Sequence, residues 1–324
     1  MRFNPKARLD NRRVRDVGGS GAPRRVGGSR IPGGMGSIPI PTGKMGLGVV
    51  VIVVLAIFVL PRLGIDMGSI TGGASLDPSR VTSETNTGRY DNCTSGADAN
   101  GTDAEAIDCQ LVAVENSLND YWSQQPQTQS AYQPEDAIIT FSGEVSTGGC
   151  GNAGSGVGPF YCPVDQTIYL DTQFYADVLE DQLGGTDAPF VRAYVIGHEF
   201  GHHLQNLLGY LGQVKTQQGP MSDAVRLELQ ADCLAGMWAR HATTTEDEDG
   251  NVLLLELTQA DIADGIQAAK TVGDDYIQQQ SGARVDSDGW THGSSQQRIA
   301  WFNTGFGGTA DDIDVCNTFA ASTL

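Results

Sequence analysis

One run of residues separates this chain from ordinary globular sequences. From Met45 to Leu60, sixteen consecutive residues lack a polar side chain. A helix needs about 20 apolar residues to span a bilayer. Arg62 can extend its aliphatic stem along the membrane, and the apolar residues after it lengthen the segment. The run therefore predicts one transmembrane helix over residues 45–65, between a short N-terminal arm and a much larger C-terminal part.

The charges on the two sides of this run are opposite. Residues 1–44 hold ten of the 20 basic residues of the chain and two of its 39 acidic residues. Because Lys and Arg collect on the cytoplasmic side of a membrane helix, we expect a cytoplasmic arm and an extracytoplasmic domain, in a periplasm or at a cell surface. The arm is rich in Gly, Pro and Arg without interleaved aromatic residues, which favours a disordered segment near anionic lipid over a nucleic-acid tail. A cleaved signal peptide is disfavoured because this lead is long and no A-x-A site follows the run.

All six cysteines follow the apolar run, on the side predicted to be oxidising. Short loops favour pairing the first with the second and the third with the fourth, which leaves the last two for each other. Structural zinc binding by cysteines is the alternative, but the chain has no C-x-x-C pair. The predicted disulfides are Cys93–Cys109, Cys150–Cys162 and Cys233–Cys316.

Composition divides the rest of the chain in two. Residues 66–101 are rich in Gly, Ser, Thr and Asn with little apolar periodicity, so they are expected to form a linker. Residues 102–324 are long enough for a substantial core and are predicted to be the folded domain. Two strand-like segments, 137–141 and 166–171, flank a Gly-rich loop and precede a mostly helical remainder, which is typical of an α+β fold with a small N-terminal sheet. Predicted helical segments cover residues 104–122, 190–210, 223–241, 257–280 and 292–306.

The segment HEFGHH, residues 198–203, carries a metal-binding pattern. His198 and His202 are four residues apart, so on a helix they share a face and can bind one metal ion. Glu199 flanks the same site at a distance suited to a metal-bound water, which makes it the general base of an H-E-x-x-H zinc motif. An amphipathic helix with surface histidines is the alternative, but the apolar surroundings of the motif indicate that these side chains are buried.

A catalytic zinc ion also needs a third protein ligand and an open position. Glu228 and Asp232, in the segment ELQAD, are again four residues apart on one helix face. Glu228 is therefore predicted to bind the metal, while Asp232 accepts the free ring N–H of a ligating histidine. A solvated helix face would be the alternative, and the apolar residues around both acids disfavour it.

Four segments together resemble the YpfJ-like family of neutral zinc metallopeptidases: GPFYCPVDQTIYLD, YVIGHEFGHHLQ, LELQADCLAGMW and THGSSQQRIAWF. The similarity covers residues 133–319 and includes the short basic lead and single membrane anchor. In gluzincins, which share this arrangement, two histidines and a downstream glutamate bind zinc. The resemblance implies a gluzincin-like domain with one zinc ion per chain, held by His198, His202 and Glu228, and with Glu199 as the general base.

A further histidine lies in the segment THGSSQQR. With His292 and Arg298 six residues apart, it is similar to the H-P-x4-R segment of HtpX-type and prenyl-protein-processing membrane peptidases, in which the histidine helps bind the tetrahedral intermediate. A donor aimed at the developing oxyanion stabilises the transition state, so His292 is a candidate catalytic residue. Gly293 stands where those peptidases have proline. The alternatives are a helix-capping role for His292 and a structural pairing of Arg298 with Asp232.

Together the patterns predict a membrane-anchored, extracytoplasmic zinc metallopeptidase that acts on a peptide or protein substrate. The strand near Thr167–Asp171 is expected to be an edge along which the substrate pairs, with Gly158 and Tyr161 shaping the cleft. The alternatives are a non-catalytic zinc-containing module that binds a cell-envelope partner and a hydrolase of non-protein amides. Glu199 favours catalysis, because a structural zinc site has four protein ligands and needs no base.

Overall fold

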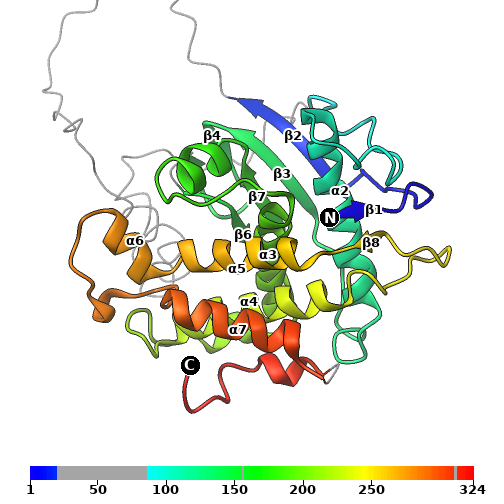
Figure 1. Ribbon diagram of the computed structural model, residues 1–324. Helices are drawn as coiled ribbons and strands as arrows, with labels where there is room; N and C mark the ends of the chain where they lie inside the picture. Colours follow the sequence, from blue (N-terminus) through cyan, green and yellow to red (C-terminus); the bar gives the residue numbers. More distant parts are fainter. Residues whose placement is uncertain (20–85, 155–156, 310–311) are drawn as a thin grey trace, which may run out of the picture.

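A four-stranded sheet packs against a stack of helices (Figure 1). The computed structural model describes residues 1–19, 86–154, 157–309 and 312–324. In the sheet, β2, β3 and β7 are parallel, and β6 runs antiparallel to β7 at one edge, in the order β2-β3-β7-β6. These strands are β2 Val14–Gly19, β3 Ala137–Ser142, β6 Phe160–Cys162 and β7 Thr167–Asp171.

Two short antiparallel pairs accompany the sheet, β1 with β8 and β4 with β5. Helix α3 packs against α2, α4 and α5, and α4 packs against α7. A π-helical segment follows β7 and precedes α3. The remaining strands are β1 Arg2–Phe3, β4 Glu144–Ser146, β5 Asn152–Gly154 and β8 Leu254–Glu256. The helices are α2 Ala104–Ser123, the π-helix Phe174–Glu180, α3 Pro189–Leu207, α4 Asp223–His241, α5 Gln259–Thr271, α6 Asp274–Gln280 and α7 Ser295–Gly307. The α+β arrangement of a small sheet followed by helices agrees with the prediction.

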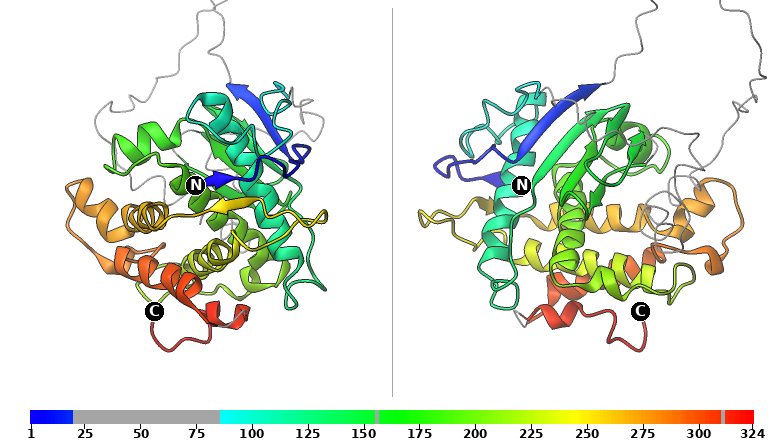
Figure 2. Two further views of the ribbon diagram at one scale, coloured as in Figure 1. Left: turned by 45° about the vertical axis from the view of Figure 1, so that its right-hand side comes forward. Right: turned by 180° about the vertical axis from the view of Figure 1, so that it is seen from behind.

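The start of the chain is part of this fold, where a disordered arm over residues 1–44 was expected. Val14 pairs with Ile138 of β3 in parallel register, and β1 pairs with β8. Phe3 is 1% exposed and Val14 is 2% exposed, so both belong to the core. The two further views show β1 and β2 alongside α2 (Figure 2). Residues 20–44 lie outside the described residues.

The predicted linker over residues 66–101 also differs from the structure in its second half. Tyr90, Cys93 and Ala99 are buried in the core. The Tyr90 hydroxyl donates to Thr140 Oγ1 of β3 at 2.9 Å. The folded body therefore includes residues from 86 onward, before the predicted boundary at 102.

The predicted membrane topology is wrong. Residues 45–65 lie outside the described residues, and within the described part of the chain no helix is both long and apolar enough to cross a bilayer. Moreover, β2 precedes the apolar run and β3 follows it, yet the two strands pair directly. A single crossing between them would place paired strands on opposite sides of a membrane, so a cytoplasmic N-terminus with an extracytoplasmic catalytic domain does not agree with this fold. The three disulfides are compatible with an oxidising compartment.

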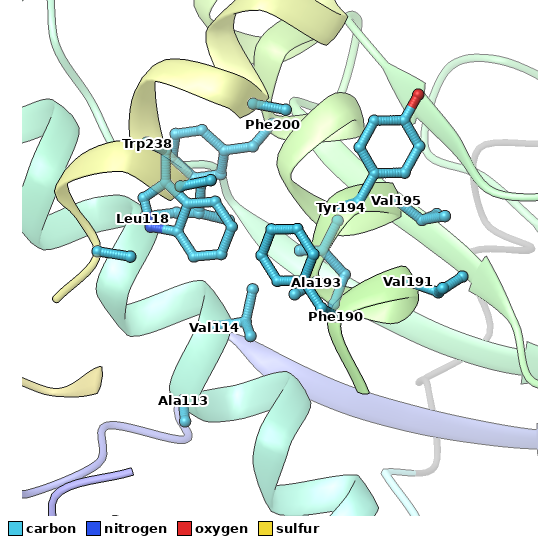
Figure 3. Packing of buried hydrophobic residues seen from close by; sticks show 14 of the residues in the cluster. Ala113, Val114, Leu118, Phe190, Val191, Ala193, Tyr194, Val195, Phe200 and Trp238 are labelled. Atoms are coloured by element: carbon cyan, nitrogen blue, oxygen red, sulfur yellow. The ribbon is translucent and has the colours of Figure 1, made fainter. Parts of the chain in front are cut away.

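The hydrophobic core lies between α2, α3 and α4 (Figure 3). Phe190 of α3 stacks on Trp238 of α4 with ring centroids 6.4 Å apart. Val114 and Leu118 of α2 lie beside these rings and are buried. Trp238 Nε1 donates to Ser117 Oγ at 3.1 Å, so the indole N–H is satisfied inside the core. This packing fixes the first half of α3, and HEFGHH occupies its second half.

Glycines allow the helices that carry the predicted site to approach closely. A Cβ atom at Gly201 of α3 would lie 2.9 Å from the Cα atom of Ala231 on α4. A Cβ atom at Gly305 of α7 would lie 1.9 Å from the carbonyl oxygen of Cys233 on α4. Side chains larger than glycine would push the helices apart. The backbones of α3 and α7 therefore each approach the backbone of α4 at short distance.

All three predicted disulfides are confirmed: Cys93–Cys109, Cys150–Cys162 and Cys233–Cys316. The last of them ties α4, the helix that carries Glu228, to the C-terminal segment. One expectation about the sheet is wrong. The strand over Thr167–Asp171 is not an edge, because β7 lies between β3 and β6, and β6 is the outer strand on that side.

Candidate metal centre

Three predicted metal ligands converge between α3 and α4. His198 and His202 share the face of α3 that meets α4, because four residues make about one helical turn. The pair Gly201 and Ala231 sets the short distance between the helices. Glu228 of α4 then reaches both imidazoles. Among the described residues, His198, His202 and Glu228 form the one group of His, Cys, Asp and Glu side chains that could hold a metal ion.

The distances between the donor atoms suit a tetrahedral metal. Glu228 Oε2 lies 3.2 Å from His198 Nε2, and Glu228 Oε1 lies 3.6 Å from His202 Nε2. One ligand atom from each residue lies within 4.8 Å of the others. Zinc ligands about 2.0–2.1 Å from the ion lie about 3.3 Å from each other in a tetrahedron. The donor set therefore fits zinc in chemistry and in spacing.

A buried network fixes the His198 ring. Its Nδ1 lies 2.8 Å from Asp232 Oδ1, so the carboxylate accepts the Nδ1–H and leaves Nε2 for the metal. Arg298 donates from Nε to Asp232 Oδ2 and from Nη2 to Oδ1, both at 2.9 Å. The Tyr194 hydroxyl donates to Asp232 Oδ1 at 2.6 Å and accepts from Arg298 Nη2 at 3.2 Å. Arg298 is thus the partner of Asp232, the structural alternative that the sequence left open.

The charges inside the centre oppose the effect of burial on the pKa values of Glu228 and His198. Burial raises the pKa of Glu228, but the imidazoles of His292, His202 and His198 lower it by more, so Glu228 is ionised. Burial lowers the pKa of His198, but Asp232 and Glu228 raise it by more, to about 9. In the metal-free protein the carboxylates therefore hold a proton on His198, which a metal ion would displace.

Glu199 lies beside the three ligands without belonging to their set. The residue is 7% exposed. Burial raises the pKa of Glu199, although the neighbouring His202 and His198 oppose the increase. A carboxylate with a raised pKa next to a metal position takes up a proton more readily than an ordinary glutamate, as suits a general base.

His292 faces the centre from the loop before α7. Burial raises the pKa of Glu228, and the charge of the nearby His292 ring is the largest of the effects that lower it. Burial lowers the pKa of His292, but Glu228 and Asp274 raise it by more. The next residue, Gly293, has φ +89°, which proline cannot adopt. The local backbone at this position therefore differs from that of the H-P-x4-R segment.

The helix cap at the start of α7 belongs to a different residue from His292. Ser294 accepts a hydrogen bond from the backbone N–H of Gln297, and the Gln297 side chain accepts one from the Ser294 backbone. This capping box satisfies the free N–H groups of the first turn. The capping alternative for His292 is therefore not what the structure shows.

The last histidine of HEFGHH lies outside the centre and holds the edge strand. His203 Nε2 lies 2.8 Å from the carbonyl oxygen of Gln133, so this nitrogen carries the proton. Its Nδ1, 3.1 Å away, then accepts from the Tyr161 hydroxyl of β6. Asn206 Nδ2 donates to the same hydroxyl at 3.0 Å. α3 thus positions both the candidate metal ligands and the strand beside them.

Sequence reasoning missed three residues that shape the centre: Tyr194, Gln205 and Asp274. Each contacts a predicted site residue, as Gln205 does with His202. For Tyr194 and Gln205 the only signal in the sequence is position, since both lie on α3 within about one turn of a predicted histidine ligand. Asp274 carries no such signal, because it lies 18 residues before His292.

Comparisons with known proteins agree with this geometry. Residues 6–319 match the model of a family described as "Putative neutral zinc metallopeptidase". An uncharacterized protein of Mycobacterium tuberculosis (strain H37Rv) is 44% identical over 266 residues, which cover 81% of this chain and 85% of the relative. The uncharacterized protein YpfJ of Escherichia coli (strain K12) is 41% identical over 212 residues, which cover 64% of this chain and 69% of YpfJ. No solved structure matches the chain.

Proposed function

Because the chain belongs to this family of neutral zinc metallopeptidases, we propose that it hydrolyses peptide bonds at the centre between α3 and α4, with Glu199 as the general base. The observation that carries the proposal is the position of Glu199. Its buried carboxylate is close enough to the three convergent ligands for their charges to act on its pKa, and it is not one of them. A structural zinc site would close its coordination with a fourth protein ligand and would need no base.

Zinc would be held by His198, His202 and Glu228. When bound, it supplies Lewis-acid activation of a water molecule and polarisation of the scissile carbonyl. Asp232 accepts the Nδ1–H of His198 and so orients this ring with Nε2 toward the metal. The ionised Glu228 would balance part of the metal charge.

Glu199 moves the proton in this proposal. Its raised pKa lets the carboxylate accept a proton from the attacking water and pass the same proton to the leaving amine. Because Glu199 follows His198 directly on α3, the helix fixes the distance between base and ligand. His292, with a raised pKa, would donate a hydrogen bond to the oxyanion that forms on the scissile carbonyl.

The substrate would lie along β6. In the described part of the chain no strand pairs with the outer side of β6, so an extended peptide can add there by backbone hydrogen bonds. Tyr161 in this strand is held by His203 and Asn206 of α3. The same helix would therefore position the peptide backbone and the ligands that act on it.

The test compares the wild-type chain with Glu199→Gln. Zinc content is measured first, then cleavage of an unfolded protein and of a mixed peptide library. We expect about one zinc per chain in both forms and a loss of cleavage of at least about 100-fold in the variant. Zinc in both forms with no cleavage by the wild type would favour the non-catalytic binding module, and hydrolysis of non-peptide amides alone would favour the amidase alternative.

A further inference from the structure

Gln205 lies where the two metal-binding helices meet. It follows His202 by three residues on α3, and it is completely buried. Gln205 Oε1 lies 2.8 Å from His202 Nδ1. Gln205 Nε2 donates to the carbonyl oxygen of Leu227 at 2.7 Å and to Gln230 Oε1 at 3.1 Å. The amide thus contacts one predicted ligand on its own helix and, on α4, the residue directly before the ligand Glu228.

The Leu227 carbonyl decides which way the amide points. A carbonyl oxygen only accepts hydrogen bonds, so the Gln205 atom that faces it must be the NH2 group. The atom that faces His202 is then Oε1, which also only accepts. His202 Nδ1 must therefore carry the proton and donate to Gln205. The other ring nitrogen, Nε2, keeps its lone pair, and this is the atom that lies 3.6 Å from Glu228 Oε1.

The two histidines are oriented by different chemistry. Behind His198 stands the carboxylate of Asp232, whose charge is balanced by Arg298. Behind His202 stands a neutral amide, which fixes the tautomer without adding a charge. A neutral partner orients the second ring without a second buried ion pair beside that of Asp232 and Arg298.

We propose that Gln205 is a positioning residue of the metal centre. Its amide holds His202 in the tautomer and ring orientation that present Nε2 to the metal. Its bond to the Leu227 carbonyl keeps His202 in register with Glu228 across the contact between α3 and α4. The inference rests on the zinc site of the proposed function and does not require peptide hydrolysis.

The experiment measures zinc affinity of the full chain by competition with a chromogenic chelator. Partners behind a metal-binding histidine contribute about 10–100-fold to metal affinity. We expect Gln205→Met, which keeps the length and removes both polar atoms, to weaken zinc binding by about that factor. Gln205→Asn keeps an amide but is one methylene shorter, so it cannot reach His202 and Leu227 together, and the same loss is expected. Gln205→Asn also provides the test if the Gln205→Met variant does not fold.

Gln230→Met is the matched control. It removes the other amide partner of Gln205 and leaves the bonds to His202 and Leu227 in place. We expect its zinc affinity to stay within about threefold of the wild type. A second readout is independent of metal: long-range proton–nitrogen NMR spectra of the metal-free chain should show His202 protonated at Nδ1 in the wild type and a mixture of tautomers in Gln205→Met.

Three results would overturn the inference. Equal zinc affinity in wild type and both Gln205 variants would show that the amide does not position His202. Equal weakening in Gln230→Met would show that packing is responsible. A wild type that binds no zinc would remove the proposed function as well, whereas the first two results leave the zinc site and Glu199 untouched.

Discussion

The Asp274 carboxylate contacts both the backbone N–H and the imidazole ring of His292. Asp274 Oδ2 accepts hydrogen bonds from the backbone N–H groups of Thr291, His292 and Gly293 at 2.8, 2.7 and 3.0 Å. Its Oδ1 lies 3.5 Å from His292 Nδ1. Burial raises the pKa of Asp274, but His292 and the backbone donors lower it by more, so the carboxylate is ionised. An ionised Asp274 favours the protonated imidazole, in which both ring nitrogens carry a proton and the charge strengthens a hydrogen bond to an oxyanion.

We therefore predict that Asp274→Asn lowers kcat about tenfold or more and leaves KM and zinc content within about twofold. The raised pKa of His292 depends in part on Asp274, so on going to higher pH the variant should lose activity earlier than the wild type. Asp275→Asn is the matched control, because the Asp275 carboxylate binds Ser295 instead. Unchanged kcat and an unshifted pH profile in Asp274→Asn would contradict the prediction.

The pair between Asp232 and Arg298 predicts a large effect on stability. Asp232 is 0% exposed and Arg298 is 3% exposed. Arg298→Met would remove the cation that contacts both oxygens of the buried carboxylate and leave it only the His198 ring and the Tyr194 hydroxyl, which costs about 3–5 kcal/mol of unfolding free energy. The double variant Asp232→Asn with Arg298→Met removes both charges and should recover much of this loss. Urea unfolding of the metal-free chain at pH 7 measures both, and a double variant as unstable as the single one would speak against a charge effect.

The partly buried carboxyl group of Asp120 is expected to make the stability of the fold depend on pH. Burial raises its pKa to about 7, and the charges of Asp247 and Glu115 add to this shift. The folded protein therefore holds a proton that the unfolded chain releases near the ordinary aspartate pKa of 3.8. Asp120 then contributes stability below that value, and the contribution is lost as the pH rises toward 7.

Asp120→Asn should accordingly be as stable as the wild type at pH 4 and more stable at pH 8, by about 2 kcal/mol after allowance for partial exposure. Thermal unfolding across this range provides the measurement. Glu105→Gln, an exposed change on the same helix, is expected to leave the difference between pH 4 and pH 8 unaltered. A constant gain from Asp120→Asn at every pH would mean that the carboxylate is not the cause.

The N-terminal segment can be tested through two neighbouring arginines. Arg13 Nε donates to Glu115 Oε1 at 2.7 Å and lies 3.9 Å from Glu135 Oε1, and both glutamate side chains are 0% exposed. Arg12 is 83% exposed and pairs with Asp10 at the surface. We predict that Arg13→Met lowers the unfolding free energy by about 3 kcal/mol, whereas Arg12→Met has a much smaller effect because that side chain is exposed to solvent. Equal small effects would show that the segment is not docked on the body.

The sequence alone paired the residues of the candidate site because helical spacing is local. Four residues return a side chain to the same helix face, so spacing alone was enough to pair His198 with His202 and Glu228 with Asp232. The disulfides followed from short loops. That the two histidines meet Glu228 is visible only in three dimensions, where Gly201 lets α3 approach α4.

The errors arose where distant segments meet. The basic residues before the apolar run indicated a disordered arm, yet β2 fills the edge of the sheet beside β3, which lies more than 100 residues later in the chain. Asp274 and Gln205 showed no pattern of their own, because each acts on a backbone or a side chain that folding brings beside it. Local periodicity therefore determined the helices and the ligands on their faces. The tertiary structure alone decided which strands pair across the apolar run, which strand is the edge, and which buried polar groups hold the ligands, because these depend on contacts between residues far apart in the chain.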